Sequence, residues 1–174
     1  MNVDEFAAQG GVWAADNDAF SDWNEERFIR MLGRLEGIPG CQWVSVPDVV
    51  ANATETLIRF YNYWKLIDSY GFPIALVGQD GMIPSDVPWE LIDCIFIGGT
   101  TEWKLGDAAR SLTIEAKRRG KLVHMGRVNS NRRLRYAKAI GCDSVDGLKF
   151  AKFSDAWLAD GLEFAAGDGQ MMLA

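Results

Sequence analysis

The stretch from residue 121 to residue 147 constrains the fold of this chain more than any other. It contains a short apolar run, a glycine, a helical pattern, a glycine stop and a second short apolar run, at residues 122–125, 126, 129–140, 141 and up to Val145. This pattern predicts a strand, a crossover helix and a parallel strand. Parallel strands present their carboxyl ends on one side of a sheet, where α/β proteins bind ligands. Asp146 stands at such an end.

The same alternation runs through most of the chain. Further strands are predicted at residues 11–16, 42–48, 73–77 and 93–97. Helices are predicted from Asp22 or Asn24 to about 35, from Asn52 to Gly71, near 89–92, from about 105 to 119, and from about 154 to 164. About six strands, each followed by a helix or helical turn, indicate one parallel α/β domain over residues 1–174, with loose ends at 1–10 and 166–174.

The length of 174 residues limits the architecture. A complete TIM-like (β/α) barrel of eight units typically needs about 250 residues. The sequence therefore predicts a reduced barrel, an incomplete barrel that a partner chain closes, or an open sheet.

Composition excludes several classes of protein. No run approaches the roughly 18 apolar residues of a membrane helix, and the first ten residues lack the pattern of a signal peptide, so a cytoplasmic protein without membrane contact is expected. The three cysteines are Cys41, Cys94 and Cys142. Their odd number and wide spacing indicate neither disulfides nor a metal site, and buried thiols are expected.

The net charge of −6 conceals a basic segment. Residues 117–138 contain nine lysines and arginines and no acid. Such a segment is either a solvated helix face or a surface that binds phosphates, and it makes nucleic acid a candidate partner. The candidate contacts are Arg127, Asn129, Arg132 and Arg133.

Polar or glycine residues end each predicted strand, namely Asp16, Asp48, Gln79, Gly98 with Gly99, Arg127 with Asn129, and Asp146. Any one of them could simply form a turn. Together at successive strand ends, they predict one shared mouth. There, one carboxylate could attack an anomeric carbon while a second moves a proton. An aspartate, a glutamine amide and glycine backbone can pair with a heterocyclic base, beside an apolar wall formed by Met125. No glycine-rich loop for a nucleotide cofactor is present, and no cofactor is expected.

Three segments in the first half of the chain are similar to motifs of one enzyme family. Residues 15–20 read Ala-Asp-Asn-Asp-Ala-Phe and look like the family's Asp-Ser-Gly-Gly-Phe loop. Residues 46–48, Val-Pro-Asp, are similar to its strand with a base-recognising aspartate. Residues 76–81, Leu-Val-Gly-Gln-Asp-Gly, resemble its Val-Gln-Gly-Gly segment.

Three further segments follow in the family's order. Residues 96–99 read Phe-Ile-Gly-Gly and match an Ile-Gly-Gly motif, and His-Met-Gly at 124–126 is similar to a Leu-Met-Gly strand end. Residues 141–146, Gly-Cys-Asp-Ser-Val-Asp, resemble Gly-Ile-Asp-x-Phe-Asp. In this order, the segments resemble the guanine transglycosylases, which exchange a guanine in tRNA or DNA for a 7-deazaguanine.

The resemblance implies a role for each matched residue. Asp146 would be the nucleophile of a covalent aspartyl-glycosyl intermediate, and Asp16 the general acid and base. Asp48, Gln79 and the backbone of Gly98–Gly99 would recognise the base. The family's zinc-binding Cys/His cluster has no counterpart after Asp146, which favours DNA over tRNA as the substrate.

Two other functions remain open from the residues. One is a transferase or hydrolase that acts on free nucleosides or nucleotides. The other is a base-binding or partner-binding subunit without catalysis, either in a homo-oligomer or completing another chain's barrel. His124, the only histidine, is expected to be a core or interface residue that points away from Met125.

Overall fold

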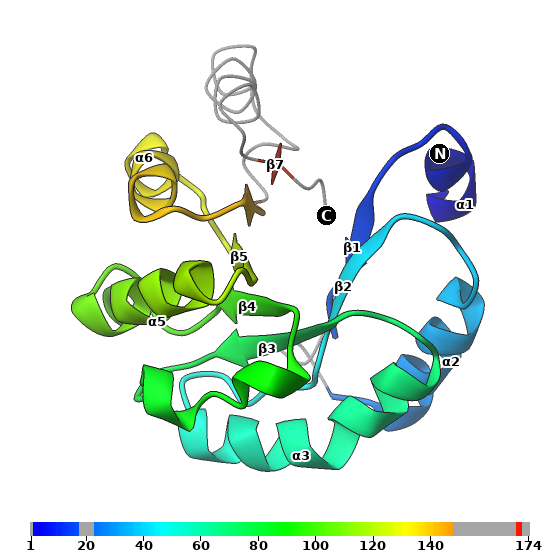
Figure 1. The fold of residues 1–174 in the computed structure, drawn as a ribbon, viewed down its shortest axis with the longest axis horizontal. Coiled ribbons are helices and arrows are strands. Elements are labelled where there is room, and N and C mark those ends of the chain that lie inside the picture. The colour runs from blue at the N-terminus through cyan, green and yellow to red at the C-terminus, as the bar shows by residue number, and fades with distance from the viewer. Residues whose placement is uncertain (1, 18–22, 148–169, 172–174) are drawn as a thin grey trace.

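The fold is a curved parallel sheet with helices on its outer side (Figure 1). The computed structural model describes residues 2–17, 23–147 and 170–171. The strands lie in chain order and pair in parallel: β1 (Trp13–Ala15), β2 (Cys41–Ser45), β3 (Ile74–Gly78), β4 (Cys94–Ile97), β5 (Leu122–Met125), β6 (Ser144–Val145) and β7 (Gln170–Met171). Strands β1 to β6 curl into a half-barrel, a TIM-like partial fold that confirms the predicted class.

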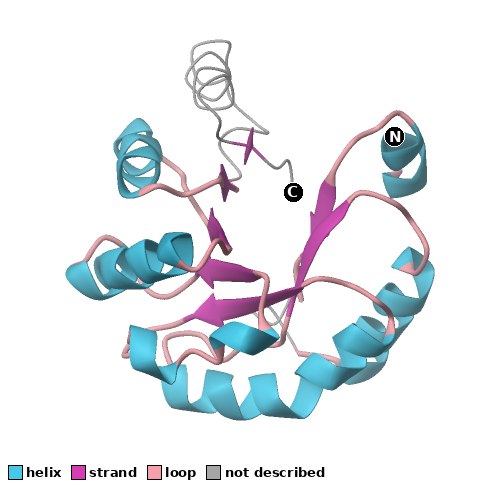
Figure 2. Ribbon diagram, in the orientation of Figure 1, coloured by secondary structure: helices cyan, strands magenta, loops and turns pink. Residues whose placement is uncertain are grey.

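The helices lie on the convex side of the sheet, and all but α1, which precedes β1, lie between successive strands (Figure 2). They are α1 (Val3–Ala8), α2 (Glu25–Leu35), α3 (Ala53–Ser69), α4 (Thr101–Lys104), α5 (Asp107–Arg118) and α6 (Asn131–Ile140), with 3-10 turns η1 (Pro84–Asp86) and η2 (Trp89–Leu91). No helix in the described part of the chain is long and apolar enough to span a membrane.

Local sequence signals set the helix ends as predicted. Asn24 caps α2 and Asn52 caps α3, each through a side-chain oxygen that accepts a backbone N–H of the first turn. Helix α6 begins after Ser130, which caps it in the same way, and ends at Gly141. Gly141 has φ 96°, a left-handed conformation that glycine adopts without steric cost.

Some elements of the structure were not expected from the sequence. Within residues 1–10, which were expected to be loose, Asn2 and Glu5 form a reciprocal capping box that starts α1. The helix expected over residues 105–119 is α5 (Asp107–Arg118), and the short helix α4 (Thr101–Lys104), which was not expected, precedes it. The tail expected to be loose contains β7, which pairs with β6. The helix expected over residues 154–164 lies outside the described residues.

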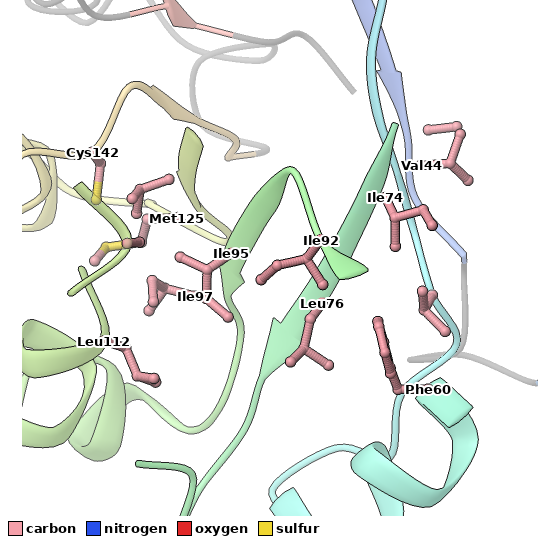
Figure 3. Close-up of a cluster of buried hydrophobic side chains, with 14 of the residues drawn as sticks. Val44, Phe60, Ile74, Leu76, Ile92, Ile95, Ile97, Leu112, Met125 and Cys142 are labelled. Carbon is pink, nitrogen blue, oxygen red and sulfur yellow. The ribbon is translucent and has the colours of Figure 1, made fainter. Parts of the chain in front are cut away.

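Apolar side chains cover both faces of the sheet, as expected for parallel strands. The core between the sheet and the helices includes Ile95, Ile97, Leu112 and Met125 (Figure 3). A separate cluster consists of Trp43, Ala75, Val77, Cys94 and Phe96. On β4, cluster membership alternates from one residue to the next, so this second cluster lies on the concave face.

The three cysteines are free thiols. Cys94 and Cys142 are buried as predicted, whereas Cys41 is half-buried. Burial raises the pKa of Cys41 and of Cys142 to about 12, so both thiols remain protonated at neutral pH.

Candidate active site

The carboxyl ends of β1 and β2 are joined by hydrogen bonds. Ser45, the last residue of β2, donates from its hydroxyl to Asp16 Oδ1 at 2.9 Å. Asn17 donates its backbone N–H to Ser45 Oγ at 2.8 Å and its side-chain amide to Asp48 Oδ1 at 3.0 Å. Asp16 and Asp48 therefore belong to one polar network at the mouth of the half-barrel.

Gln79 extends this network from β2 to β4. Its side-chain amide donates to Asp48 Oδ2 at 2.5 Å, so each oxygen of that carboxylate has a donor. Its side-chain oxygen accepts the backbone N–H groups of Ala51 at 2.8 Å and Gly99 at 3.0 Å. Both the nitrogen and the oxygen of the Gln79 side-chain amide therefore bond to protein atoms, and the amide fixes the relative positions of three strand ends.

Gly98 and Gly99 allow close packing at the end of β4. A Cβ on Gly98 would lie 2.7 Å from a methyl group of Val77, and a Cβ on Gly99 would lie 2.4 Å from the ring of Trp103. Gly99 also has φ 60°, which favours glycine. Here the glycines allow protein groups to approach the backbone closely.

Arg127 completes the network at Asp146. Its guanidinium donates to the carbonyl oxygen of Gly99 at 2.6 Å, and its backbone N–H donates to Asp146 Oδ1 at 2.6 Å. Hydrogen bonds thus connect the ends of β2, β3, β4, β5 and β6 with the end of β1. The structure brings Asp16, Asp48 and Asp146 into one mouth.

His124 holds the other oxygen of Asp146. Its Nε2 lies 3.1 Å from Asp146 Oδ2, and its Nδ1 lies 2.8 Å from Ser144 Oγ. An ionised carboxylate only accepts hydrogen bonds, so Nε2 donates to Asp146, while Nδ1 shares a hydrogen bond with the Ser144 hydroxyl. The imidazole packs between Trp43 and Phe96, with ring centroids at 4.9 Å and 4.6 Å.

The orientation of His124 away from Met125 was predicted correctly, but its bond to Asp146 was missed. The signal was available in the pairing of β5 with β6. His124 lies opposite Ser144, and Asp146 follows two residues later on the same face. Strand alternation and register together would have placed the histidine beside the carboxylate.

Met125 is not part of the mouth, which contradicts the expectation that it forms an apolar wall. Its side chain is fully buried on the helix side of the sheet, near Ile97 and Cys142 (Figure 3). The period of two along β5 puts Met125 and His124 on opposite faces. The apolar surface on the concave face is formed instead by a cluster that includes the aromatic rings of Trp43 and Phe96.

The two outer carboxylates have pKa values shifted in opposite directions. Neighbouring protein groups exclude water from part of the Asp16 carboxylate and raise its pKa, although the residue as a whole is exposed. The negative charge of Asp146 raises this pKa further, against the hydrogen bonds from Ser45 and Asn17. Burial also acts to raise the pKa of Asp146. The hydrogen bond and the charge of His124, followed by the hydrogen bond from the Arg127 backbone N–H, outweigh burial and lower this pKa. Burial also raises the pKa of Asp48. Asp146 is ionised and 23% of its side chain is exposed, so a ligand can reach it.

Lys104 is a buried cation that the sequence did not point to. It ends the short helix α4, is 2% exposed, and donates from its amine to the carbonyl oxygen of Gly126. Burial, together with repulsion from Arg127 and Arg133, lowers the pKa of Lys104 to about 7, although Asp146 acts in the opposite direction.

The expected nucleic-acid contacts divide into two groups. Arg132 is exposed on α6, whereas Arg133 donates to the Arg127 carbonyl oxygen at 3.2 Å and to Thr101 Oγ1 at 3.1 Å. Asn129 has a buried side-chain oxygen that accepts no hydrogen bond from the described residues. Arg133 and Arg127 therefore shape the loop after β5, and Arg132 faces solvent.

The basic segment is partly neutralised. On α5, Lys117 pairs with Asp143 at 2.5 Å, and Arg118 and Arg119 pair with Glu115 at 2.7 Å and 2.6 Å. Helix α6 has no acid in its sequence, and its exposed cations, Arg132, Arg135 and Lys138, form no ion pair within the described ranges. The unneutralised basic surface is therefore the outer face of α6.

A cavity of about 660 Å³ opens beside the end of β1. Asp16 and Asn17 line it together with the side chains of α2, namely Arg27, Phe28, Arg30, Met31 and Arg34. Asp16 can thus be reached from the α2 side of the mouth. No cluster of three or more His, Cys, Asp or Glu side chains suited to a metal ion occurs among residues 2–17, 23–147 and 170–171.

The fold is similar to those of TIM-barrel enzymes from different families. The Bacillus subtilis YkuI protein, with an EAL domain and in complex with its substrate c-di-GMP and calcium, matches with TM-score 0.53 and 16% identity over 95% of this chain and 47% of its own. Type I 3-dehydroquinate dehydratase from Clostridium difficile, with covalently modified comenic acid, matches with TM-score 0.50 and 12% identity over 92% and 73%.

The chain spans about half the length of YkuI, and also of a mandelate oxidase that matches with TM-score 0.49 and 14% identity over 83% of this chain and 51% of its own. No protein-family model matches the sequence, and the comparison with curated proteins gave no match. At these identities, the likeness concerns the fold alone.

Proposed function

We propose that this protein is a base-exchange glycosyltransferase that replaces guanine in nucleic acid with a 7-deazaguanine. The observation that carries the proposal is the hydrogen-bonded network that joins Asp16, Asp48 and Asp146 in one mouth, where the pKa values of Asp16 and Asp146 are shifted in opposite directions. Paired carboxyl groups whose environments separate their pKa values are suited to act as nucleophile and acid. Asp146 would be the nucleophile and Asp16 the acid.

The reaction has two half-steps. In the first, ionised Asp146 attacks the anomeric carbon, and a carbon–oxygen bond forms as the bond to the base nitrogen breaks. The departing base keeps the electron pair and takes a proton from Asp16. In the second, Asp16 removes a proton from the entering base, whose nitrogen attacks the same carbon and releases Asp146. Both half-steps balance without a cofactor.

The base would be recognised by Asp48, Gln79 and Gly99, which are connected by hydrogen bonds at the strand ends. In the structure, Asn17 and Gln79 donate to the two oxygens of Asp48. A guanine-like edge with two adjacent N–H groups offers the same pair of donors and would displace these amides from Asp48. The freed amides could then pair with the rest of the base.

The polymer would lie along the outer face of α6, where Arg132, Arg135 and Lys138 are available to phosphates. DNA is favoured over tRNA because residues 147–150 read Gly-Leu-Lys-Phe, where the family that the sequence resembles has a Cys-x-x-Pro-Thr-Arg segment. A second candidate function is transfer or hydrolysis on free nucleosides or nucleotides. Neutralisation of the α5 cations by acids favours it, because only a small basic surface remains.

The experiment offers guanine-containing DNA, tRNA and guanosine in parallel, each with labelled guanine or a labelled 7-deazaguanine, and measures incorporation. Covalent adducts are detected on denaturing gels. We expect incorporation into DNA, and an adduct that disappears in Asp146→Asn. The matched control is Asp68→Asn, an exposed aspartate on α3. An adduct that survives in Asp146→Asn removes that residue from the role, and incorporation only into guanosine selects the second candidate.

A further inference from the structure

The peptide group between Gly126 and Arg127 has hydrogen-bond partners at both ends. Its carbonyl oxygen accepts a hydrogen bond from the amine of Lys104. Its N–H donates to Oδ1 of Asp146 at 2.6 Å. A single planar amide thus joins a buried amine to the candidate nucleophile.

Lys104 has an unusual environment for a lysine. It is 2% exposed, and no carboxylate within the described residues forms an ion pair with it. Burying an ammonium group without an ion pair is costly, so lysine is rarely fully buried. The one hydrogen bond of the Lys104 amine goes to the carbonyl oxygen of Gly126. Any effect of Lys104 on the site therefore passes through this carbonyl, which belongs to the loop that holds Asp146.

The physical link is polarisation of the amide. A cation at the oxygen draws electron density along the peptide unit and makes its N–H a stronger donor. The bond to ionised Asp146 strengthens as a result. Loss of the proton from Lys104 weakens the same bond, because a neutral amine polarises the carbonyl less.

We propose that Lys104 is a positioning residue for Asp146, which acts through the Gly126–Arg127 peptide group to orient the carboxylate and keep it ionised. The proposal rests on the proposed function only in taking Asp146 as the nucleophile. It assigns no contact between Lys104 and substrate.

The backbone at residues 126–127 has an unusual conformation that the Lys104 hydrogen bond helps to hold. Arg127 has φ 57°, a conformation that non-glycine residues rarely adopt, and its guanidinium is tied to the carbonyl of Gly99. A Cβ at position 126 would lie 2.4 Å from the ring of Phe96. The backbone is thus held close to the concave face, in an arrangement that points the Arg127 N–H at Asp146.

The charges around Lys104 make the link sensitive to pH. Burial and the cations Arg127 and Arg133 lower its pKa to about 7, whereas Asp146 and Asp80 at the end of β3 act to raise it. The amine therefore changes charge near neutral pH. Because coupling between two sites is reciprocal, the proton on Lys104 must lower the pKa of Asp146 as much as the charge of Asp146 raises that of Lys104.

The test follows the Arg127 amide proton and the Asp146 carboxyl carbon by NMR across pH in the full chain without substrate. In the wild type, we expect the amide signal to move with a midpoint near pH 7. In Lys104→Met, that movement should disappear and the pKa of Asp146 should rise by about half a pH unit, a threefold change in its acid constant. The control, Lys65→Met, removes an exposed lysine of α3 and should change neither.

An amide inflection that survives in Lys104→Met, or an unchanged Asp146 pKa, overturns the proposal. If Lys104→Met does not fold, the proposal is tested by measuring the pKa of Lys104 in a variant of Asp146. In Asp146→Asn, the pKa of Lys104 should fall further, and an unchanged value overturns the proposal. These readouts need no base exchange, so a chain that shows both shifts but exchanges no base refutes the proposed function and leaves the coupling intact.

Kinetics give a further readout if exchange is found. Lys104→Met should lower kcat about tenfold with little change in KM, because the loss affects the nucleophile and not substrate binding. An equal rise in KM with unchanged kcat would contradict the positioning role.

Discussion

His124 Nε2 lies 3.1 Å from Asp146 Oδ2, and this contact joins the centre of the concave apolar cluster to the polar mouth of the half-barrel. Asp146 is therefore held from both sides, by an imidazole on one oxygen and by the Arg127 backbone N–H on the other. Since both partners donate, they favour the charged form of the carboxylate.

Replacing His124 tests this support directly. We expect His124→Phe to raise the pKa of Asp146 and to lower the rate of covalent adduct formation at least about tenfold, because the carboxylate loses a donor in a half-buried site. His124→Gln, which can still donate, should recover part of the rate. Adduct formation at the wild-type rate in His124→Phe would show that the Arg127 N–H alone suffices.

The pH profile of exchange follows from the two shifted carboxyl groups. Activity needs Asp146 ionised and Asp16 protonated, so it should fall as pH drops through the lowered Asp146 pKa and as pH rises through the raised Asp16 pKa. In Asp16→Asn, the alkaline limb should vanish and the rate should drop by about 10² to 10⁴. If the alkaline limb persists in Asp16→Asn but disappears in Lys104→Met, it reports the titration of Lys104.

Gly126 is predicted to be essential for stability. In Gly126→Ala, the new methyl group would overlap the Phe96 ring, and we expect a loss of about 1 to 3 kcal/mol in the free energy of unfolding, measured with urea. The control is Gly33→Ala in α2, where a Cβ meets nothing within 4 Å and better helix propensity should add about 0.5 to 1 kcal/mol. Adding Phe96→Leu should restore much of the loss. Equal stability of Gly126→Ala and the wild type would contradict the packing argument.

The salt dependence of oligonucleotide binding distinguishes a nucleic-acid substrate from a free nucleoside substrate. If DNA lies along α6, the affinity for an oligonucleotide should fall steeply with salt, and Arg132→Ser with Arg135→Ser should reduce the logarithmic slope by about 2. Arg118→Ser should change it little, because Arg118 is paired with Glu115. A flat salt dependence in the wild type would favour the nucleoside substrate.

Strand ends were predictable from sequence because each buried strand is a short apolar run that stops at a polar or glycine residue. The positions of Asp16, Asp48, Gln79 and Asp146 in one mouth follow from that pattern and from parallel pairing. Met125 was misplaced because it was assigned to the mouth from its position near a strand end, without regard to the face of the strand that it occupies, which the alternation along β5 determines.

Lys104 could not be found from sequence by the same reasoning. It ends a four-residue helix, and its burial depends on the loop after β5, more than 20 residues later in the chain. Strand β7 was missed for a similar reason. A two-residue strand has no periodicity of its own, and only its pairing with β6 defines it.

The order of strands in the sheet, which repeats their order in the chain, has a consequence for biosynthesis. As the polypeptide leaves the ribosome, each strand can pair with the one made just before it. Asp16 follows the first strand and Asp146 follows the sixth, so a nascent chain that stops before residue 144 contains the proposed proton carrier but not the proposed nucleophile. In the proposed mechanism, the growing protein gains activity only after translation has passed β6.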